Sequence, residues 1–194
     1  MIIGLSGYAR SGKDEAAKVL VEEFGFTRVA FADKLREVLY QLNPIVFAEI
    51  GFRGADNFDK NTMPIYVQDV IDEYGWNGYK ETKYGTEIRR LLQRLGTEAG
   101  RKTLWDSIWV DAAFAGVELE NIVVTDCRFP NEAQAITQRG GQIWRITRKG
   151  VGPANQHPSE TSLDDWPWDK TIGNNGTLEA YHSTVRRALD ASRV

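Results

Sequence analysis

Residues 7–14, which read GYARSGKD, have the types and spacing of a phosphate-binding loop. They follow the pattern G-x4-G-K and depart from it only at the last position, where Ser or Thr is usual. Glycine at the two fixed positions lets successive backbone N–H groups turn toward phosphate oxygens, and the lysine can reach the β- and γ-phosphates. The residues expected to bind a nucleotide there are Gly7, Ala9, Arg10, Ser11, Gly12, Lys13 and Asp14.

The sequence around this loop supplies the strand and the helix that it needs. Residues 2–6 are an apolar run of the kind found in buried parallel strands. Residues 13–24 then show a helical period and end at Gly25, and the positive N-terminal end of such a helix favours bound phosphate. This context favours a phosphate site over a glycine-rich turn that binds nothing.

Asp14 and Asp126 are the candidates for holding Mg²⁺, which prefers hard oxygen ligands. Asp14 occupies the loop position where a hydroxyl normally coordinates the metal, although it could instead only stabilise the start of the helix. Asp126 ends the apolar run 122–125, at the carboxyl end of an expected strand. There it could hold the metal's water shell, receive a proton from the acceptor, or act as a capping or turn residue. Arg128, two residues further, is expected to contact phosphate.

Apolar runs and helical periods alternate along the chain. The expected strands cover residues 2–6, 26–31, 121–125, 142–147 and 170–173. The expected helices cover residues 13–24, 32–42, 65–74, 87–95, 104–114, 131–139 and 178–191. Five strands separated by helices predict an α/β fold with three layers, a mainly parallel five-stranded sheet covered on both faces. We expect a single domain over residues 1–194, with a helical insertion at about 44–115 and a lid loop at about 148–160.

Composition excludes several classes of protein. The net charge of −3 over 194 residues leaves no basic face for duplex nucleic acid. The single cysteine, Cys127, excludes an internal disulfide, fits a reducing compartment and is expected to pack at a strand end. The first residues lack the basic segment of a signal peptide, and no apolar run is long enough to cross a bilayer. We therefore expect a cytoplasmic protein with neither a nucleic-acid nor a membrane partner.

Arginines lie on the outer surface of the expected helix 87–95. Its inward stripe consists of Ile88, Leu91, Leu92 and Leu95. Arg90 and Gln93 fall outside that stripe, and either an acceptor-phosphate site or a solvated basic face would explain them. Arg148 opens the expected lid loop and is the lid candidate, whereas Arg145 alternates with apolar neighbours and is expected to face solvent. The aromatic residues Trp76, Tyr79, Tyr84 and Trp105 could stack on a base or simply pack.

The order and spacing of these motifs resemble the deoxynucleoside monophosphate kinases of bacteriophages, a branch of the P-loop kinases. The resemblance runs nearly from end to end of the chain. Its carriers are GKD at residues 12–14, FADKLR at 31–36, LQRLGTE at 92–98 with Arg101, VTDCRFPNE at 124–132, HPSE at 157–160 and IGNNGT at 172–177. Glu15 departs from the family pattern, which usually has a hydroxyl residue after GKD, so Asp14 would carry more of the metal binding.

The resemblance implies the P-loop NTPase fold, ATP as donor, Mg²⁺ as cofactor, a deoxynucleoside monophosphate as acceptor and often a homodimer. It implies the host cytoplasm if the protein is encoded by a phage. The catalytic residues are then expected to be Lys13, Asp126, Arg128 and Arg148. The acceptor-binding residues are expected to be Asp33, Lys34, Arg90, Gln93, Thr97, Glu98, Arg101, Ser159 and Glu160. His157 belongs to the same motif as the last two and is worth testing.

Two other functions remain open from the sequence. A related P-loop kinase could act on another phosphorylated acceptor, such as dephospho-coenzyme A or phosphomevalonate. A nucleotide-driven switch or binding protein would need ordered switch loops and a partner surface, for which the sequence has no distinctive candidate. A nucleic-acid motor is disfavoured by the acidic net charge.

Overall fold

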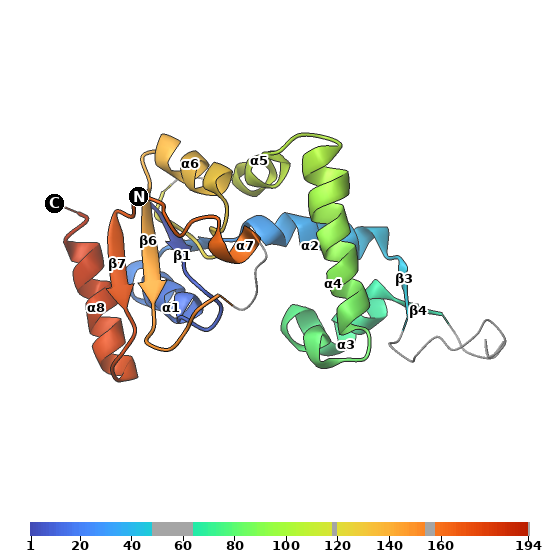
Figure 1. The fold of residues 1–194 in the computed structure, drawn as a ribbon, viewed down its shortest axis with the longest axis horizontal. Helices are drawn as coiled ribbons and strands as arrows, with labels where there is room; N and C mark the ends of the chain where they lie inside the picture. The colour runs from blue at the N-terminus through green and yellow to red at the C-terminus, as the bar shows by residue number, and fades with distance from the viewer. Residues whose placement is uncertain (48–63, 118–119, 154–157, 194) are drawn as a thin grey trace. The chain divides into compact units, whose positions relative to one another are not determined.

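The computed structural model describes residues 1–47, 64–117, 120–153 and 158–193. The chain divides into two compact units (Figure 1). The first unit comprises residues 1–31 and 110–194, and the second comprises residues 32–109. The single-domain organisation over residues 1–194 stays a prediction.

The first unit contains a five-stranded parallel sheet. Its strands are β1 (Ile2–Ser6), β2 (Thr27–Val29), β5 (Ile122–Val124), β6 (Gln142–Thr147) and β7 (Lys170–Gly173). They lie in the order β2-β5-β1-β6-β7, and every neighbouring pair is parallel. The central strand β1 is therefore the one that leads into the phosphate loop. The predicted fold class is confirmed.

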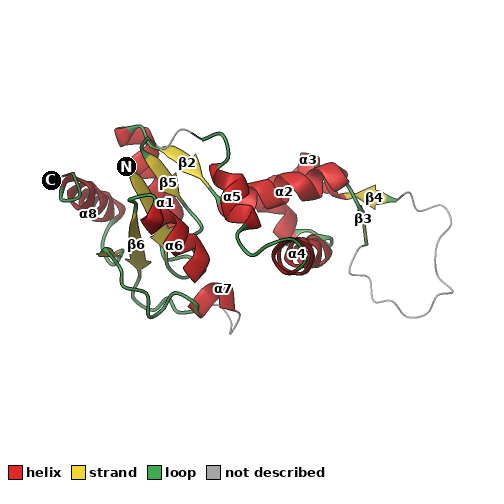
Figure 2. Ribbon diagram, turned by 90° about the horizontal axis from the view of Figure 1, so that it is seen from above, coloured by secondary structure: helices red, strands yellow, loops and turns green. Residues whose placement is uncertain are grey.

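Helices cover both faces of this sheet (Figure 2). Successive strand residues point to opposite faces, so Ile3 packs on one side and Ile2 on the other. The first side is covered by α1 (Lys13–Phe24) and α8 (Leu178–Asp190). The second is covered by α6 (Pro130–Gln138) and by the end of α5 (Ile108–Phe114). The three-layer arrangement is thus a consequence of strands that are apolar on both faces.

The second unit is mostly helical. Its elements are α2 (Phe31–Leu42), β3 (Ile45–Val46), β4 (Ile65–Tyr66), α3 (Val67–Gly78), the 3₁₀ helix η2 (Tyr79–Glu81), α4 (Gly85–Gln93) and the π-helix η3 (Arg94–Lys102). Leu39, Val70 and Ile88 are buried in its core. The predicted inward stripe is confirmed, because Leu91, Leu92 and Leu95 pack against that core.

Several element boundaries differ from the sequence predictions. The expected helix 65–74 begins instead with β4, which pairs antiparallel with β3, and α3 then runs to Gly78. Strands of two residues are too short to show the alternation on which a prediction depends. The short helix α7 (Pro158–Thr161) lies where only a loop was expected. No helix in the described ranges is both long and apolar enough to span a bilayer.

Candidate active site

The phosphate loop connects the buried end of β1 to the start of α1. Its backbone takes positive φ angles at Gly7 (140°), Arg10 (67°) and Gly12 (109°). A Cβ atom at Gly7 would collide with the carbonyl oxygen of Ile146, so glycine is required there for space as well as for conformation. Ser11 Oγ is buried and has no hydrogen-bond partner among the described residues. A buried hydroxyl without a partner inside such a loop suits a site that receives phosphate oxygens.

The ammonium of Lys13 lies over the same loop. It donates hydrogen bonds to the carbonyl oxygens of Gly7 (2.7 Å) and Tyr8 (2.9 Å). The pKa of Lys13 is lowered to about 8, mainly by burial and secondly by the nearby positive charge of Arg128. Three carboxylates, those of Asp14, Glu160 and Asp126, act in the opposite direction. The structure therefore brings together five charged side chains, all of which were predicted site residues.

Asp126 also has a structural role. Its Oδ1 accepts a 2.8 Å hydrogen bond from the backbone N–H of Phe31, the first residue of α2. This contact stabilises the start of α2, and a role of Asp126 in metal binding stays a prediction. Asp14, in the first turn of α1, is exposed.

Arg128 is held by two glutamates. Its side chain donates a 2.9 Å hydrogen bond to Glu160, whose own side chain is only 9% exposed. The backbone N–H groups of Arg128 and Phe129 both donate to the buried carboxylate of Glu132, at 2.8 and 3.0 Å. Glu132 was not predicted as a site residue, although its place three residues after Phe129 is the spacing of a capping box.

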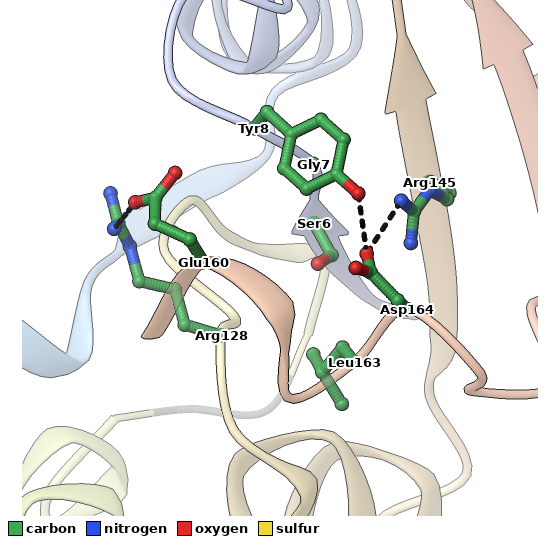
Figure 3. A pocket seen from close by; sticks show the side chains of 8 residues that line it. All are labelled: Ser6, Gly7, Tyr8, Arg128, Arg145, Glu160, Leu163 and Asp164. Carbon is green, nitrogen blue, oxygen red and sulfur yellow. Dashed lines mark hydrogen bonds and ion pairs between the residues drawn. The ribbon is translucent and has the colours of Figure 1, made fainter. Parts of the chain in front are cut away.

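A small pocket lies beside the loop, between the Arg128–Glu160 pair and a second cluster (Figure 3). In that cluster Asp164 accepts hydrogen bonds from Tyr8 Oη and from Arg145, both at 2.8 Å. The guanidinium of Arg145 lies 5.2 Å from the ring centre of Tyr8 and 4.8 Å from that of Trp168. The prediction that Arg145 faces solvent is wrong, because its side chain is only 15% exposed.

The family model described as deoxynucleotide monophosphate kinase matches residues 45–185. The chain belongs to this family. A putative deoxynucleotide monophosphate kinase of Acanthamoeba polyphaga mimivirus is 28% identical, with 98% of this chain and 96% of that protein aligned. The deoxynucleotide monophosphate kinase of Escherichia phage RB69 is 24% identical over 97% of this chain and 99% of its own. Among solved structures, dephospho-CoA kinase from Campylobacter jejuni is 11% identical, with a TM-score of 0.48 over 97% and 95% of the two chains.

In this deoxynucleotide monophosphate kinase, many of the predicted acceptor residues lie in the second unit. Arg90 is 54% exposed and makes a two-pronged ion pair with Glu87 of its own helix, at 2.7 and 2.8 Å. Asp33 pairs with Arg36, and Lys34 with Glu37. Gln93, Thr97 and Glu98 are exposed, and Arg101 is half-buried.

Thr97, Glu98 and Arg101 of the kinase lie on the π-helix η3, beyond the expected end of helix 87–95. The indole N–H of Trp109 donates a 2.9 Å hydrogen bond to the carbonyl oxygen of Gly96. A Cβ atom at Gly100 would come within 2.7 Å of the Trp109 ring. Gly100 thus lets the ring pack directly on the helix backbone, and widened helical turns of this kind are frequent at functional sites.

The remaining predicted residues of the kinase are either buried in the core, exposed at the surface or outside the described residues. Cys127 is buried, as predicted, and burial raises the pKa of its thiol. Arg148 is exposed directly after β6. Tyr79 is buried against Trp76 with their rings at nearly a right angle, whereas Trp105 is exposed. His157 and the side chain of Ser159 lie outside the described part of the chain.

Proposed function

We propose that this chain transfers the γ-phosphate of ATP to a deoxynucleoside 5′-monophosphate, producing the diphosphate and ADP. Family membership supports the reaction and the class of acceptor. The structural observation that carries the proposal is the position of Lys13. Its partly desolvated ammonium lies over a glycine-rich loop at the start of a helix, beside Arg128 and three carboxylates.

On the donor side, the phosphate loop and Lys13 bind the triphosphate. Backbone N–H groups of residues 7–14 and the positive end of α1 attract the phosphate oxygens. Lys13 neutralises charge on the β- and γ-phosphates as the bond to the leaving group lengthens. Because this ammonium is largely removed from water, its attraction for phosphate is stronger than that of a solvated lysine.

Asp14 and Asp126 fit the requirements of a Mg²⁺ site. Both carboxylates act on the ammonium of Lys13, so they lie around one point, and both offer hard oxygen ligands. The described residues contain no group of three or more His, Cys, Asp or Glu side chains that could hold a metal alone. This fits a metal that is completed by water and substrate phosphates, the usual arrangement for Mg²⁺. When bound, Mg²⁺ would neutralise charge on the donor phosphates.

The transfer itself needs no protein nucleophile. An oxygen of the acceptor's 5′-phosphate forms a bond to the γ-phosphorus while the bond from that phosphorus to the β–γ bridging oxygen breaks, and ADP leaves with the electron pair. The second pKa of a phosphate monoester is about 6, so at neutral pH the attacking oxygen is already ionised. A general base is then unnecessary, and Asp126 acts on the metal, not as a proton acceptor.

Arginines position the two sets of phosphates. Arg128 is directed by Glu160 and Glu132 toward the charges around Lys13, so it stabilises the transferring phosphoryl group. Asp33, Lys34, Arg90, Gln93, Thr97, Glu98 and Arg101, with Ser159 and Glu160, bind the acceptor. Arg148 belongs to a lid over residues 148–160 that excludes water. The chain works as one kinase domain in the cytoplasm, as a homodimer.

The test is a substrate screen. The purified protein is incubated with ATP and Mg²⁺ and with each common deoxynucleoside or nucleoside monophosphate, and release of ADP and formation of the diphosphate are followed. We expect rapid ADP release only when a deoxynucleoside monophosphate is present. Lys13→Ala should lower turnover by about two orders of magnitude or more while leaving the circular dichroism spectrum unchanged. ADP release that is equally fast without acceptor would contradict the proposal.

A further inference from the structure

The phosphate loop can bind phosphate only if its N–H groups point inward, which requires its carbonyl groups to point away. In the structure these carbonyl oxygens have partners. Those of Gly7 and Tyr8 accept from Lys13, and that of Tyr8 also accepts from the N–H of Ser11 at 3.2 Å. The carbonyl oxygens of Ser11 and Gly12 lie at the other end of the loop and accept hydrogen bonds from residues far away in the sequence.

Asn174, which follows β7, holds the first of these two carbonyls. Its Nδ2 donates a 2.9 Å hydrogen bond to Ser11 O, across 163 positions of sequence. The amide is also packed against Gly12, where a Cβ atom would collide with Nδ2. The backbone N–H of Asn174 donates to Thr147 O at 2.7 Å, which anchors the residue to the end of β6. Asn174 is therefore fixed by its backbone and directed at the loop by its side chain.

Tyr181, on α8, holds the second carbonyl. Its hydroxyl donates a 3.0 Å hydrogen bond to Gly12 O, which also accepts from the N–H of Ala16 within α1. The side chain is 2% exposed and packs in the core formed by β1, α1 and α8. Burial raises the pKa of Tyr181, so its hydroxyl stays a donor at every physiological pH. A phenol held this rigidly sets the direction of the peptide group that follows Gly12.

We infer that Asn174 and Tyr181 are positioning residues for ATP, which hold the Ser11 and Gly12 carbonyls outward and so direct the N–H groups of Gly12 and Lys13 at the donor phosphates. This inference rests on the proposed role of the loop in ATP binding. Neither residue touches the nucleotide in this scheme. Both act through the peptide groups 11–12 and 12–13, whose two ends face opposite ways because a peptide unit is planar. Losing either bond lets the loop populate orientations that bind phosphate poorly.

The experiment measures binding of ATP with Mg²⁺ in the absence of acceptor, and the KM values of both substrates, for Tyr181→Phe and Asn174→Ala. Each variant loses a neutral hydrogen bond, so the Kd and KM for ATP should rise about three- to ten-fold. The KM of the acceptor should change by less than about two-fold. Tyr181→Phe keeps the buried ring, so it carries the test even if Asn174→Ala fails to fold.

Two matched controls separate this effect from general loosening. Tyr40→Phe removes a tyrosine hydroxyl that is bonded to Asp72 at 2.7 Å, within the second unit. Asn175→Ala removes the neighbouring amide, whose oxygen accepts from the N–H of Lys149 at 2.7 Å. Both should leave ATP binding within two-fold of the native value.

The outcomes distinguish the inference from the proposed function. If Tyr181→Phe is folded and binds ATP as the native protein does, or if both KM values rise together, the positioning role is wrong. If the native protein binds no ATP, or if Lys13→Ala binds it equally well, the proposed function fails first. A selective rise for ATP that is absent from both controls supports the inference.

Discussion

The hydroxyl of Tyr8 donates a 2.8 Å hydrogen bond to Asp164, a residue 156 positions later in the chain. The same carboxylate oxygen accepts from Arg145, whose guanidinium lies over the ring of Tyr8 (Figure 3). The second residue of the phosphate loop is thereby tied both to β6 and to the segment that follows α7. The carboxylate of Asp164 thus holds the start of the phosphate loop through Tyr8, and Asn174 and Tyr181 hold the end of the loop.

Asp164→Ala should destabilise the protein and loosen the start of the phosphate loop. It leaves Arg145, which is 15% exposed, without its carboxylate partner, and it removes the acceptor of the Tyr8 hydroxyl. Because Asp164 itself is 34% exposed, we expect a loss of about 1 kcal/mol in the free energy of unfolding. The measurement is urea unfolding followed by circular dichroism. Asp165→Ala, an exposed neighbour, is the control, and equal losses in the two variants would refute a specific role for Asp164.

The pH dependence of ATP use should report the ionisation of Lys13. Its pKa is lowered to about 8, so the ammonium is present below that pH and is lost as the pH rises through it. We therefore expect kcat/KM for ATP to fall above about pH 8, since this quantity reports groups of the free enzyme. The value of kcat should persist to higher pH, because bound triphosphate favours the charged form.

Lys13→Arg is the matched variant for this prediction, since a guanidinium stays charged throughout the range. It should lower the overall rate but flatten the profile of kcat/KM between about pH 7 and 10. The profiles are measured at saturating acceptor. An unchanged fall above pH 8 in Lys13→Arg would assign the ionisation to another group.

The metal assignment predicts a specific kinetic change at two carboxylates. Asp14→Asn and Asp126→Asn should each raise the Mg²⁺ concentration that gives half-maximal rate, because each loses a charged oxygen ligand. The effect of Asp126→Asn on stability should also be measured, since this side chain accepts from the N–H of Phe31. Glu15→Gln is a suitable control, because the Glu15 carboxylate is hydrogen-bonded to the imidazole of His182, with Oε1 and Nε2 2.7 Å apart. A lower rate with the same Mg²⁺ dependence would point to a structural role.

The acceptor-site assignment predicts separable changes in the two KM values. Arg101→Ala and Arg90→Ala should each raise the KM for the nucleoside monophosphate about ten- to a hundred-fold, because each removes one charge-assisted hydrogen-bonding group. The KM for ATP should rise far less. The measurement is a two-substrate kinetic grid, with exposed Lys102→Ala as the charge-matched control. If neither KM changes, these arginines form a solvated face.

Local patterns were sufficient for much of the fold. The helix Lys13–Phe24 and the strands Gln142–Thr147 and Lys170–Gly173 have the bounds that the sequence predicted. The last helix, expected over residues 178–191, begins at a capping residue, since the side chain of Thr177 accepts from the N–H of Ala180. These features depend on neighbouring residues, on apolar runs and on capping chemistry. Such signals are contained in a few consecutive positions.

The π-helix shows where local patterns were insufficient. The stripe through Ile88 and Leu95 correctly predicted a helix, but the helix was expected to end at Leu95. In the structure the helix continues, because the indole of Trp109 binds the carbonyl of Gly96 and packs against Gly100. Glycine commonly ends a helix by taking a positive φ angle, and Gly96 does not take one here.

By itself, the sequence determined the phosphate-loop motif, the parallel sheet that carries it and the family. Each of these can be recognised from contiguous residues or from the order of motifs along the chain. Only the tertiary structure decided which side chains hold that loop. Arg145 was predicted to face solvent, and Asn174 and Tyr181 had no predicted role, yet all three act on or beside the loop. Their partners lie far away in sequence, and a hydrogen bond depends on distance and direction in space, which the folded chain alone specifies.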